Sequence, residues 1–489
     1  MSYHLPALLF LLPLLAAISM PVVCLKHRQW SRPLSLAVLA AMVAVSLVNV
    51  ISIVKHGEVR YAFSGWAAPL GIEWVADALA SIIMVLLSVL GFLAIVFIGP
   101  TSPKDLGPRI VHFYILILLL ISSLTGIVFA GDLFNLFVFL EVAAISSYAL
   151  IGVAGGRALF AAFRYLVLGT LGASLYLLGV SYFYAASGTL NMADMAEKLP
   201  QLLTSKAVIG GLLFMFIGLG IKMAMVPFHA WLPDAYTYAP ESISPILAAL
   251  VTKVALLGWV RIIYWVLGAK AIVHDIPVLL LVGVLGTLAT IIGAVLALAQ
   301  RDIKMMFAYG GISHIGIILI GISQGNQTGF VGGVFYLLND AVMQAALFFL
   351  AGIAISQYGI RTVDEMGKLG KRAPLFTGAL IVVALGMIGL PPTGGFFGKW
   401  YIILGALEAD NYVAVIAVLL STLLTLAYFV KLFEGIFRAT TASPDIPEDD
   451  MPFACRLSVG ATSAAVIILG LFSDPIVQLL LSQALPPGL

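Results

Sequence analysis

The stretch GIKMAMVPFHAWLPDAY (residues 220–236) places a lysine, Lys222, in an apolar segment that contains Pro227 and Pro233. A second stretch, GLPPTGGFFGKW (residues 389–400), combines a lysine with four helix-breaking residues, namely Lys399 with Pro391, Pro392, Gly394 and Gly395. Unwound backbone at membrane depth is tolerated only where it is buried in protein or lines water. The two stretches therefore predict two broken helices beside an internal polar path.

The composition around these stretches is that of a chain solvated by lipid. Of its 489 residues 62% are hydrophobic and only 10% are charged, and the mean hydropathy is +1.11. A soluble domain has about 25% charged residues. Apolar runs of the length that spans a bilayer, about 20 residues, recur along the whole sequence and are too long for barrel strands of about ten. We predict an all-α polytopic membrane protein.

Charge clusters and Gly/Pro breaks divide the sequence into fourteen predicted spans. The two broken stretches fall in the seventh and the twelfth span. An odd shift of five spans inverts one unit relative to the other, which is typical of inverted-repeat transporters. The predicted spans are 4–25, 33–54, 74–98, 110–129, 132–154, 160–186, 207–238, 243–267, 276–299, 304–323, 329–356, 373–407, 411–436 and 457–484.

The loop charges predict the orientation. About 16 Lys and Arg residues, including Lys304, Lys371 and Arg372, fall in one set of loops and about 5 in the other. Since positive loops stay in the cytoplasm, both termini are expected outside the inner (plasma) membrane of a prokaryotic cell. Residues 5–25 are followed, not preceded, by basic residues, so we interpret them as a retained first helix. Arg261 lies near a span end and is expected to snorkel outward.

Five titratable side chains inside the spans are the candidates for proton translocation: Glu141, Lys222, Lys253, His314 and Lys399. A charge at mid-bilayer costs on the order of 2.5–3.5 kcal/mol, so it usually faces a cavity or a partner. Desolvation lowers the pKa of a lysine, and a nearby carboxylate raises it again. A carboxylate that moves can therefore switch a lysine between holding and releasing a proton, and a histidine is a natural relay.

Each candidate also has a structural interpretation. Glu141 and Lys222 could form an ion pair that only fixes helix packing. Lys253 could snorkel, and Lys399 could be a helix-end lysine after a proline turn. His314 could be a hydrogen-bonded core histidine.

Three further residues are possible accessories: His229, Asp340 and Gln344. His229 lies in the first break, where it either relays protons or caps freed backbone. Asp340 is costly at its depth, so we expect it to be paired or protonated.

The sequence predicts neither a metal site nor a cofactor. Cys24 and Cys455 are the only cysteines, which excludes a disulfide framework and a CxxC motif. Haem needs paired axial ligands, and the seven histidines fall mostly in loops or breaks. The net charge of +2 indicates no nucleic-acid partner. An acidic run, TTASPDIPEDDMP (residues 440–452), is expected to be a solvated loop or a partner contact.

Four motifs resemble the antiporter-like subunits shared by Mrp cation/proton antiporters, respiratory complex I and membrane-bound hydrogenases, with the Mrp D subunit most similar. They extend over residues 110 to 410 approximately. The motifs are FNLFVFLEVAAISSYALIG (134–152), GIKMAMVPFHAWLPDAY (220–236), RDIKMMFAYGGISHIG (301–316) and GLPPTGGFFGKW (389–400).

The resemblance implies an organisation and roles. Residues 1–109 are the first three helices, 110–267 the first repeat, 268–436 the second, and 437–489 the acidic loop and last helix. By motif match, Glu141 is the modulating carboxylate of Lys222, Lys253 and His314 lie on a central hydrophilic axis, and Lys399 is the lysine at the twelfth-helix break. Many members have His and Lys in the eleventh helix, where this chain has Asp340 and Gln344, which puts a relay step there in doubt.

We therefore expect a proton-translocating subunit of a multisubunit Na⁺/proton antiporter, with other membrane subunits, the bilayer, protons and sodium as partners. The alternative is a proton-pumping membrane subunit of a complex I-like, hydrogenase or sulfur-reductase complex. Either way we expect a transporter subunit with no redox chemistry of its own. A redox subunit that itself binds haem or quinone is a weaker hypothesis, because the histidines are poorly placed for haem. A solute transporter is weaker too, because it does not explain three lysines in line with one glutamate.

Overall fold

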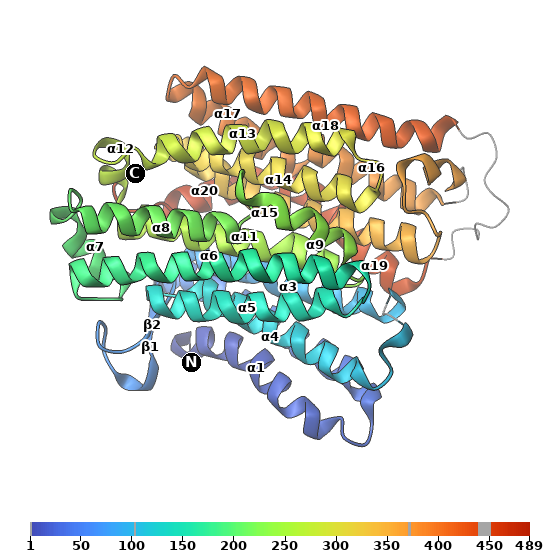
Figure 1. Cartoon of the computed structure of the whole chain (residues 1–489), viewed down its shortest axis with the longest axis horizontal. Coiled ribbons are helices and arrows are strands. Elements are labelled where there is room, and N and C mark those ends of the chain that lie inside the picture. The colour runs from blue at the N-terminus through green and yellow to red at the C-terminus, as the bar shows by residue number, and fades with distance from the viewer. Residues whose placement is uncertain (1, 102–103, 370–372, 439–450) are drawn as a thin grey trace.

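Helices make up almost all of the computed structural model, which describes residues 2–101, 104–369, 373–438 and 451–489. Most of them run side by side along the long axis of the molecule (Figure 1). Within these residues, twelve helical segments are long and apolar enough to cross a membrane. They are α1 (Leu5–Val23), α2 (Ser31–His56), α3 (Ala78–Thr101), α4 (Ile110–Phe129), α5 (Leu133–Gly152), α6 (Arg157–Ser187), the segment Ser244–Val266, α13 (Val278–Ala299), α14 (Ile303–Ile322), α15 (Gln327–Ser356), α18 (Tyr412–Arg438) and α19 (Phe453–Leu471).

The seventh and twelfth predicted spans are the two missing from that set, because each is broken into shorter helices. The seventh consists of α8 (Lys206–Lys222), a turn, a 3₁₀ turn (Phe228–Trp231) and α9 (Leu232–Tyr238). The twelfth consists of α16 (Pro374–Ile388) and α17 (Gly394–Glu408). Of the fourteen predicted spans, twelve thus contain one continuous helical segment of membrane-spanning length, and two are broken into shorter helices.

The eighth span is continuous but irregular. It begins with α10 (Ser244–Ile246), and two π-helical turns, Leu247–Val251 and Ile262–Val266, flank α11 (Thr252–Arg261). π-Helical turns leave local backbone groups without their usual partners and occur frequently at functional sites. This irregular segment contains Lys253.

Two predicted spans differ from the structure at their ends. The third, predicted from residue 74, begins only at Ala78, because β2 (Glu73–Ala76) pairs antiparallel with β1 (Val59–Ala62). The last, predicted as 457–484, divides into α19 and α20 (Ser473–Gln483). The sequence Ser-Asp-Pro at residues 473–475 has the composition of a helix start, so a new helix begins there.

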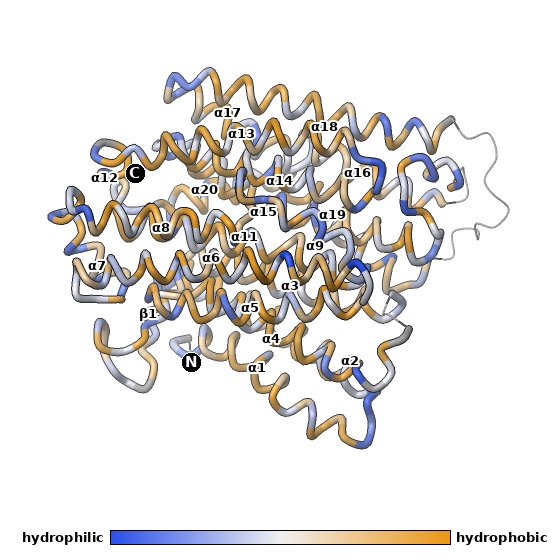
Figure 2. The backbone as a smooth tube through the Cα atoms, in the orientation of Figure 1, coloured by the Kyte–Doolittle hydropathy of each residue, from blue (hydrophilic) through white to orange (hydrophobic). Residues whose placement is uncertain are grey.

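Two short helices, α7 (Met192–Lys198) and α12 (Ala269–His274), complete the set. Lys371, Arg372 and the acidic run up to residue 450 lie outside the described residues. Both termini lie at the same end of the molecule, beside the β-hairpin and toward the left of Figure 1. We call this end the terminal face and the other end the distal face. Hydrophilic residues gather toward both ends, whereas the middle of the helices is mostly hydrophobic (Figure 2).

Helix bounds recur at a fixed interval. Both ends of α14 lie 170 residues beyond those of α5, and α15 begins 170 residues after α6. The Asp132 side chain caps α5 by accepting from Asn135 N, and the Asp302 side chain caps α14 by accepting from Met305 N. This spacing is what two related units of the predicted kind would produce.

The second break depends on the absence of a side chain at Gly395. A Cβ atom there would collide with the carbonyl oxygen of Gly386, where α17 packs on α16. Overpacking against backbone costs about 1–3 kcal/mol or more. We expect Gly395→Ala to lower the melting temperature and yield of the detergent-solubilised protein.

Gly378→Ala is the matched control, because nothing lies within 4 Å of a Cβ at that position in α16. We expect its melting temperature to equal that of the wild type. Equal melting of both variants would show that the α16–α17 contact tolerates a side chain.

A candidate proton-transfer axis

The first break places Lys222 against a carboxylate. α8 ends at Lys222, whose Nζ donates to Glu141 Oε1 of α5 over 2.8 Å. The lysine side chain is 4% exposed and the glutamate 24%, so the carboxylate is the more accessible partner. The break itself is well supported, since Trp231 donates its indole N–H to the Ile221 carbonyl and stacks on Tyr165 with ring centroids 3.8 Å apart.

Lys253, Asp340 and His314 form one buried cluster from three spans. Lys253 Nζ lies 2.9 Å from Asp340 Oδ2, and His314 Nδ1 lies 3.1 Å from Asp340 Oδ1. The lysine also donates to the Ala248 carbonyl in the π-helical turn over 2.7 Å. Asp340 was expected to be paired or protonated. In the structure it lies between Lys253 and His314, with one carboxylate oxygen near each. Its position gives the buried Lys253 a counter-charge and puts a carboxylate oxygen within hydrogen-bond distance of His314.

His314 has two competing neighbours at one ring nitrogen. Besides Asp340 Oδ1, the Tyr336 hydroxyl lies 3.0 Å from His314 Nδ1. A single ring nitrogen cannot donate to Asp340 and accept from Tyr336 at the same time. The opposite nitrogen, Nε2, is buried and makes no hydrogen bond to the part of the chain that the structure describes. The imidazole can therefore change tautomer without moving.

Lys399 lies after the second break, on α17, and has no carboxylate partner among the described residues. Its Nζ donates to the carbonyls of Met387 and Ile388, both over 3.0 Å, and to Thr422 Oγ1 over 3.1 Å. These carbonyls belong to the last turn of α16, where helix acceptors lack internal partners. The helix end thus solvates a buried ammonium group.

Two further accessory residues and the two prolines of the seventh span occupy different kinds of position. Gln344, one turn after Asp340 on α15, is buried, and neither of its amide atoms bonds to the described chain. His229 lies in the 3₁₀ turn of the first break. Its Nδ1 is buried and makes no hydrogen bond to the described residues. Pro227 lies in the break, but Pro233 occupies the first turn of α9. There a proline starts a helix instead of interrupting one.

The prolines and glycines of the second break occupy two kinds of position. Pro391 and Pro392 lie between α16 and α17, whereas Gly394 and Gly395 are the first residues of α17. The unwound backbone is therefore confined to the few residues before Gly394.

The expectation that Arg261 snorkels outward is wrong. Its guanidinium is buried, donates to both carboxylate oxygens of Asp77 over 2.6 and 2.8 Å, and lies 5.3 Å from the ring centre of Trp265. Burial acts to raise the pKa of Asp77, but Arg261 and the Ala80 N–H outweigh it and lower that pKa below its ordinary value. The β-hairpin ends just before Asp77 and so brings a carboxylate to the arginine.

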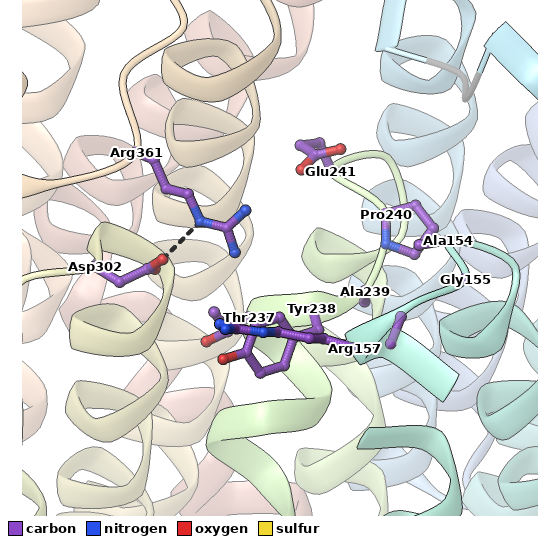
Figure 3. Close-up of a pocket in the computed structure, with 11 residues that line it drawn as sticks. Ala154, Gly155, Arg157, Thr237, Tyr238, Ala239, Pro240, Glu241, Asp302 and Arg361 are labelled. Atoms are coloured by element: carbon purple, nitrogen blue, oxygen red, sulfur yellow. Dashed lines mark hydrogen bonds and ion pairs between the residues drawn. The ribbon is translucent and has the colours of Figure 1, made fainter. Parts of the chain in front are cut away.

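A cavity of about 620 Å³ opens at the distal face (Figure 3). Arg361 bonds to Asp302 on one side, Glu241 lies opposite, and the Arg157 guanidinium lies 6.0 Å from the ring centre of Tyr238. Lys304, which the charge count placed in a loop, is instead buried in the first turn of α14, with its Nζ donating to a carbonyl of this cavity wall. Its placement in a loop was wrong because α14 begins one residue before this lysine.

The sequence pattern of the family described as "NADH:quinone oxidoreductase/Mrp antiporter, TM" matches residues 130–425, a stretch that contains the Glu141–Lys222 pair, the Lys253–Asp340–His314 cluster and Lys399. The chain belongs to this family. The N subunit of the NADH-quinone oxidoreductase of Desulforudis audaxviator is 38% identical to this family member, over 99% of both chains. The D subunit of the Na⁺/H⁺ antiporter of Bacillus subtilis is 31% identical over 87% of this chain and 85% of its own.

Solved structures agree with the family membership. One is a chain of the membrane-bound sulfane sulfur reductase, an archaeal respiratory membrane complex. It superposes on our chain with a TM-score of 0.90 and is 29% identical to it, over 98% of our chain and 97% of the reductase chain. The predicted resemblance to the antiporter-like family is thus confirmed.

Sequence reasoning missed the role of Asp340 as the common partner of Lys253 and His314. The signal was present, because a carboxylate in an apolar helix needs a cation nearby. Its partners lie 87 and 26 residues away, however, and no local pattern identifies them. Lys304 and the Asp77–Arg261 pair were missed for the same reason.

Proposed function

We propose that this chain is a proton-translocating membrane subunit of a multisubunit complex, with protons moving along Glu141, Lys222, Lys253, His314 and Lys399. The observation that carries the proposal is that three lysines are buried at the helix breaks and the π-helical turn, and two of them contact a carboxylate. A structural protein gains little from such groups, because burying charges costs more than packing apolar side chains of the same size. The breaks allow the backbone beside them to move.

The chemistry follows from the contacts. While Glu141 remains beside Lys222, its negative charge favours the protonated amine. If the carboxylate moves away, the ammonium becomes a proton donor. Asp340 holds Lys253 in the same way, and His314 can pass a proton through its ring from Nδ1 to the free Nε2. Lys399, whose hydrogen bonds to the described residues all go to neutral groups, is the next carrier: its ammonium releases a proton, and the resulting amine accepts the next one.

We propose separately which process drives the movement of protons. The Mrp-type setting, with sodium as the second ion, is supported by the antiporter D subunit at 31% identity. A redox-driven setting is supported by the oxidoreductase N subunit at 38% identity over 99% of both chains. The oxidoreductase N subunit has the higher identity and matches over more of both chains. We therefore favour the redox-driven setting over the Mrp setting predicted from the sequence.

Purification of the tagged chain from its native membrane in mild detergent tests the setting. Iron–sulfur or nickel-binding subunits that co-purify would support a redox machine, and only small membrane subunits would support an Mrp antiporter. Recovery of the chain alone, under conditions that keep other membrane complexes intact, would contradict both settings.

Substitutions of the first pair test proton transfer. We expect Glu141→Gln and Lys222→Met to lower proton transport by at least about 100-fold, the effect of removing a positioned proton-transfer group. The measurement is pH-dye quenching in membrane vesicles that contain the assembled complex.

The matched control is the exposed pair Asp194 and Lys198, which has the same chemistry at 2.9 Å on α7. Asp194→Asn and Lys198→Met should transport like the wild type. Normal transport by the Glu141 and Lys222 variants would sink the proposal.

A further inference from the structure

The distal cavity lies between the two units. Its lining comes from the loop after α5 and the end of α9 in the first unit, and from Asp302 and Arg361 in the second. Figure 3 shows Glu241 and the Arg361–Asp302 pair facing each other across it. Charged groups on both sides suit this cavity to water rather than to an apolar ligand. It is the opening on the side where the sequence predicts the cytoplasm.

Lys304 lies directly behind the wall of this cavity. Its Nζ donates to the carbonyl of Ala239, a residue that lines the cavity, over 2.7 Å. The side chain is buried, and the described residues include no salt-bridge partner for it. Glu241 and Asp302 are acidic groups that act on it electrostatically without a salt bridge, and Arg361 engages Asp302 over 2.9 Å. A buried ammonium without a bound counter-charge is expensive to keep for packing alone.

Polar groups continue inward from Lys304. Ser244 donates to the Tyr236 carbonyl over 2.8 Å, and the Tyr236 hydroxyl donates to the Leu247 carbonyl over 2.9 Å. Leu247 begins the π-helical turn, whose Ala248 carbonyl accepts from Lys253 over 2.7 Å. Ser244 Oγ also lies 3.5 Å from the Ala239 carbonyl that accepts from Lys304. Buried polar groups therefore lie between the wall of the distal cavity and the Lys253–Asp340 pair.

We propose that Lys304 is the proton carrier between the distal cavity and the Lys253–Asp340 pair. The ammonium releases one proton inward toward the pair, and the resulting amine takes one proton from cavity water, so the charge of the site is restored in each cycle. This inference rests on the proposed function and adds the point at which protons enter or leave the axis. It requires both a titratable amine at this position and an open cavity.

Two substitutions at Lys304 separate a carrier from a structural charge. Arginine keeps the charge but does not deprotonate in proteins, and methionine removes the charge at similar length. We expect both Lys304→Arg and Lys304→Met to slow proton transport by about tenfold or more. Rescue by Lys304→Arg, or normal transport by both, would overturn the proposal.

Blocking the cavity provides a second test that does not depend on whether the Lys304 variants fold correctly. In a chain with Cys24→Ala and Cys455→Ala, Ala154→Cys presents an exposed thiol at the cavity. Gln29→Cys, exposed in the loop between α1 and α2, is the control on the same face. We expect a bulky membrane-impermeant maleimide to inhibit transport only in the Ala154→Cys chain. Normal transport by the fully labelled Ala154→Cys chain would overturn the cavity as the opening.

Glu141→Gln in the same vesicles distinguishes the two levels of the proposal. If Glu141→Gln stops transport while the Lys304 variants and the labelled cavity do not, only this inference fails. If Glu141→Gln also transports normally, the proposed function fails with it.

Discussion

Asp340→Asn is expected to abolish proton transport and to destabilise the protein at the same time. Asparagine has nearly the same shape but no charge, so the buried ammonium of Lys253 loses its counter-charge at 2.9 Å. Breaking a buried ion pair by removing one partner costs about 3–5 kcal/mol. Asparagine also keeps only one acceptor oxygen where Asp340 has two, so Lys253 and His314 can no longer each have one. Thermal unfolding of the solubilised complex and dye quenching in vesicles measure the two effects.

A double variant separates the two consequences. Lys253→Met combined with Asp340→Asn removes both buried charges, and replacement of a buried pair by uncharged groups is often neutral for stability. We expect the double variant to recover most of the lost melting temperature and to remain inactive. If Asp340→Asn transports protons at the wild-type rate, Asp340 is only a packing residue and the axis does not pass through it.

Lys399→Met is expected to abolish transport while leaving the protein as stable as before, or more stable. Lys399 has no ion-pair partner in the described chain, only carbonyl groups and Thr422. On insertion scales, a lysine at mid-bilayer costs on the order of 2.5–3.5 kcal/mol, and methionine removes that cost. A residue whose loss raises stability and stops activity has been retained for function.

Lys431→Met is the matched control for Lys399→Met. Lys431 also donates to helix-end carbonyls, those of Leu298 and Gln300 at the end of α13, over 3.2 and 2.9 Å. It is partly exposed at the distal end of α18 and lies off the proposed path. Its replacement should leave transport within about twofold of the wild type, because a helix-end contact is worth only about 0.3–1 kcal/mol. Equal losses in both variants would mean that transport reports general damage.

Asp340→Asn and Lys399→Met are expected to change stability in opposite directions, although both abolish transport. Asp340 compensates charges that are already buried, so removing it leaves a cost behind. Lys399 is itself an uncompensated charge, so removing it takes a cost away. A purely structural account of these residues predicts that transport and stability fall together.

Local sequence determined the membrane class, the spans and the two breaks. Hydropathy over about 20 residues, and the backbone effects of proline and glycine, act within a single span. For the same reason, the intramembrane positions of Lys222, Lys253 and Lys399 could be predicted. The ends of spans were less well predicted where a hairpin or a new helix start, as at Asp77 and Ser473, competes with the apolar run.

Only the tertiary structure decided which charges meet. Asp77 and Arg261 are 184 residues apart, and Lys304 and Ala239 are 65 apart, so no local spacing could pair them. A buried charge demands a partner but does not specify which one, because Coulomb attraction depends on distance in space and not on separation along the chain. The packing of helices that are far apart in the sequence supplies that distance, and with it the position of Asp340 between Lys253 and His314.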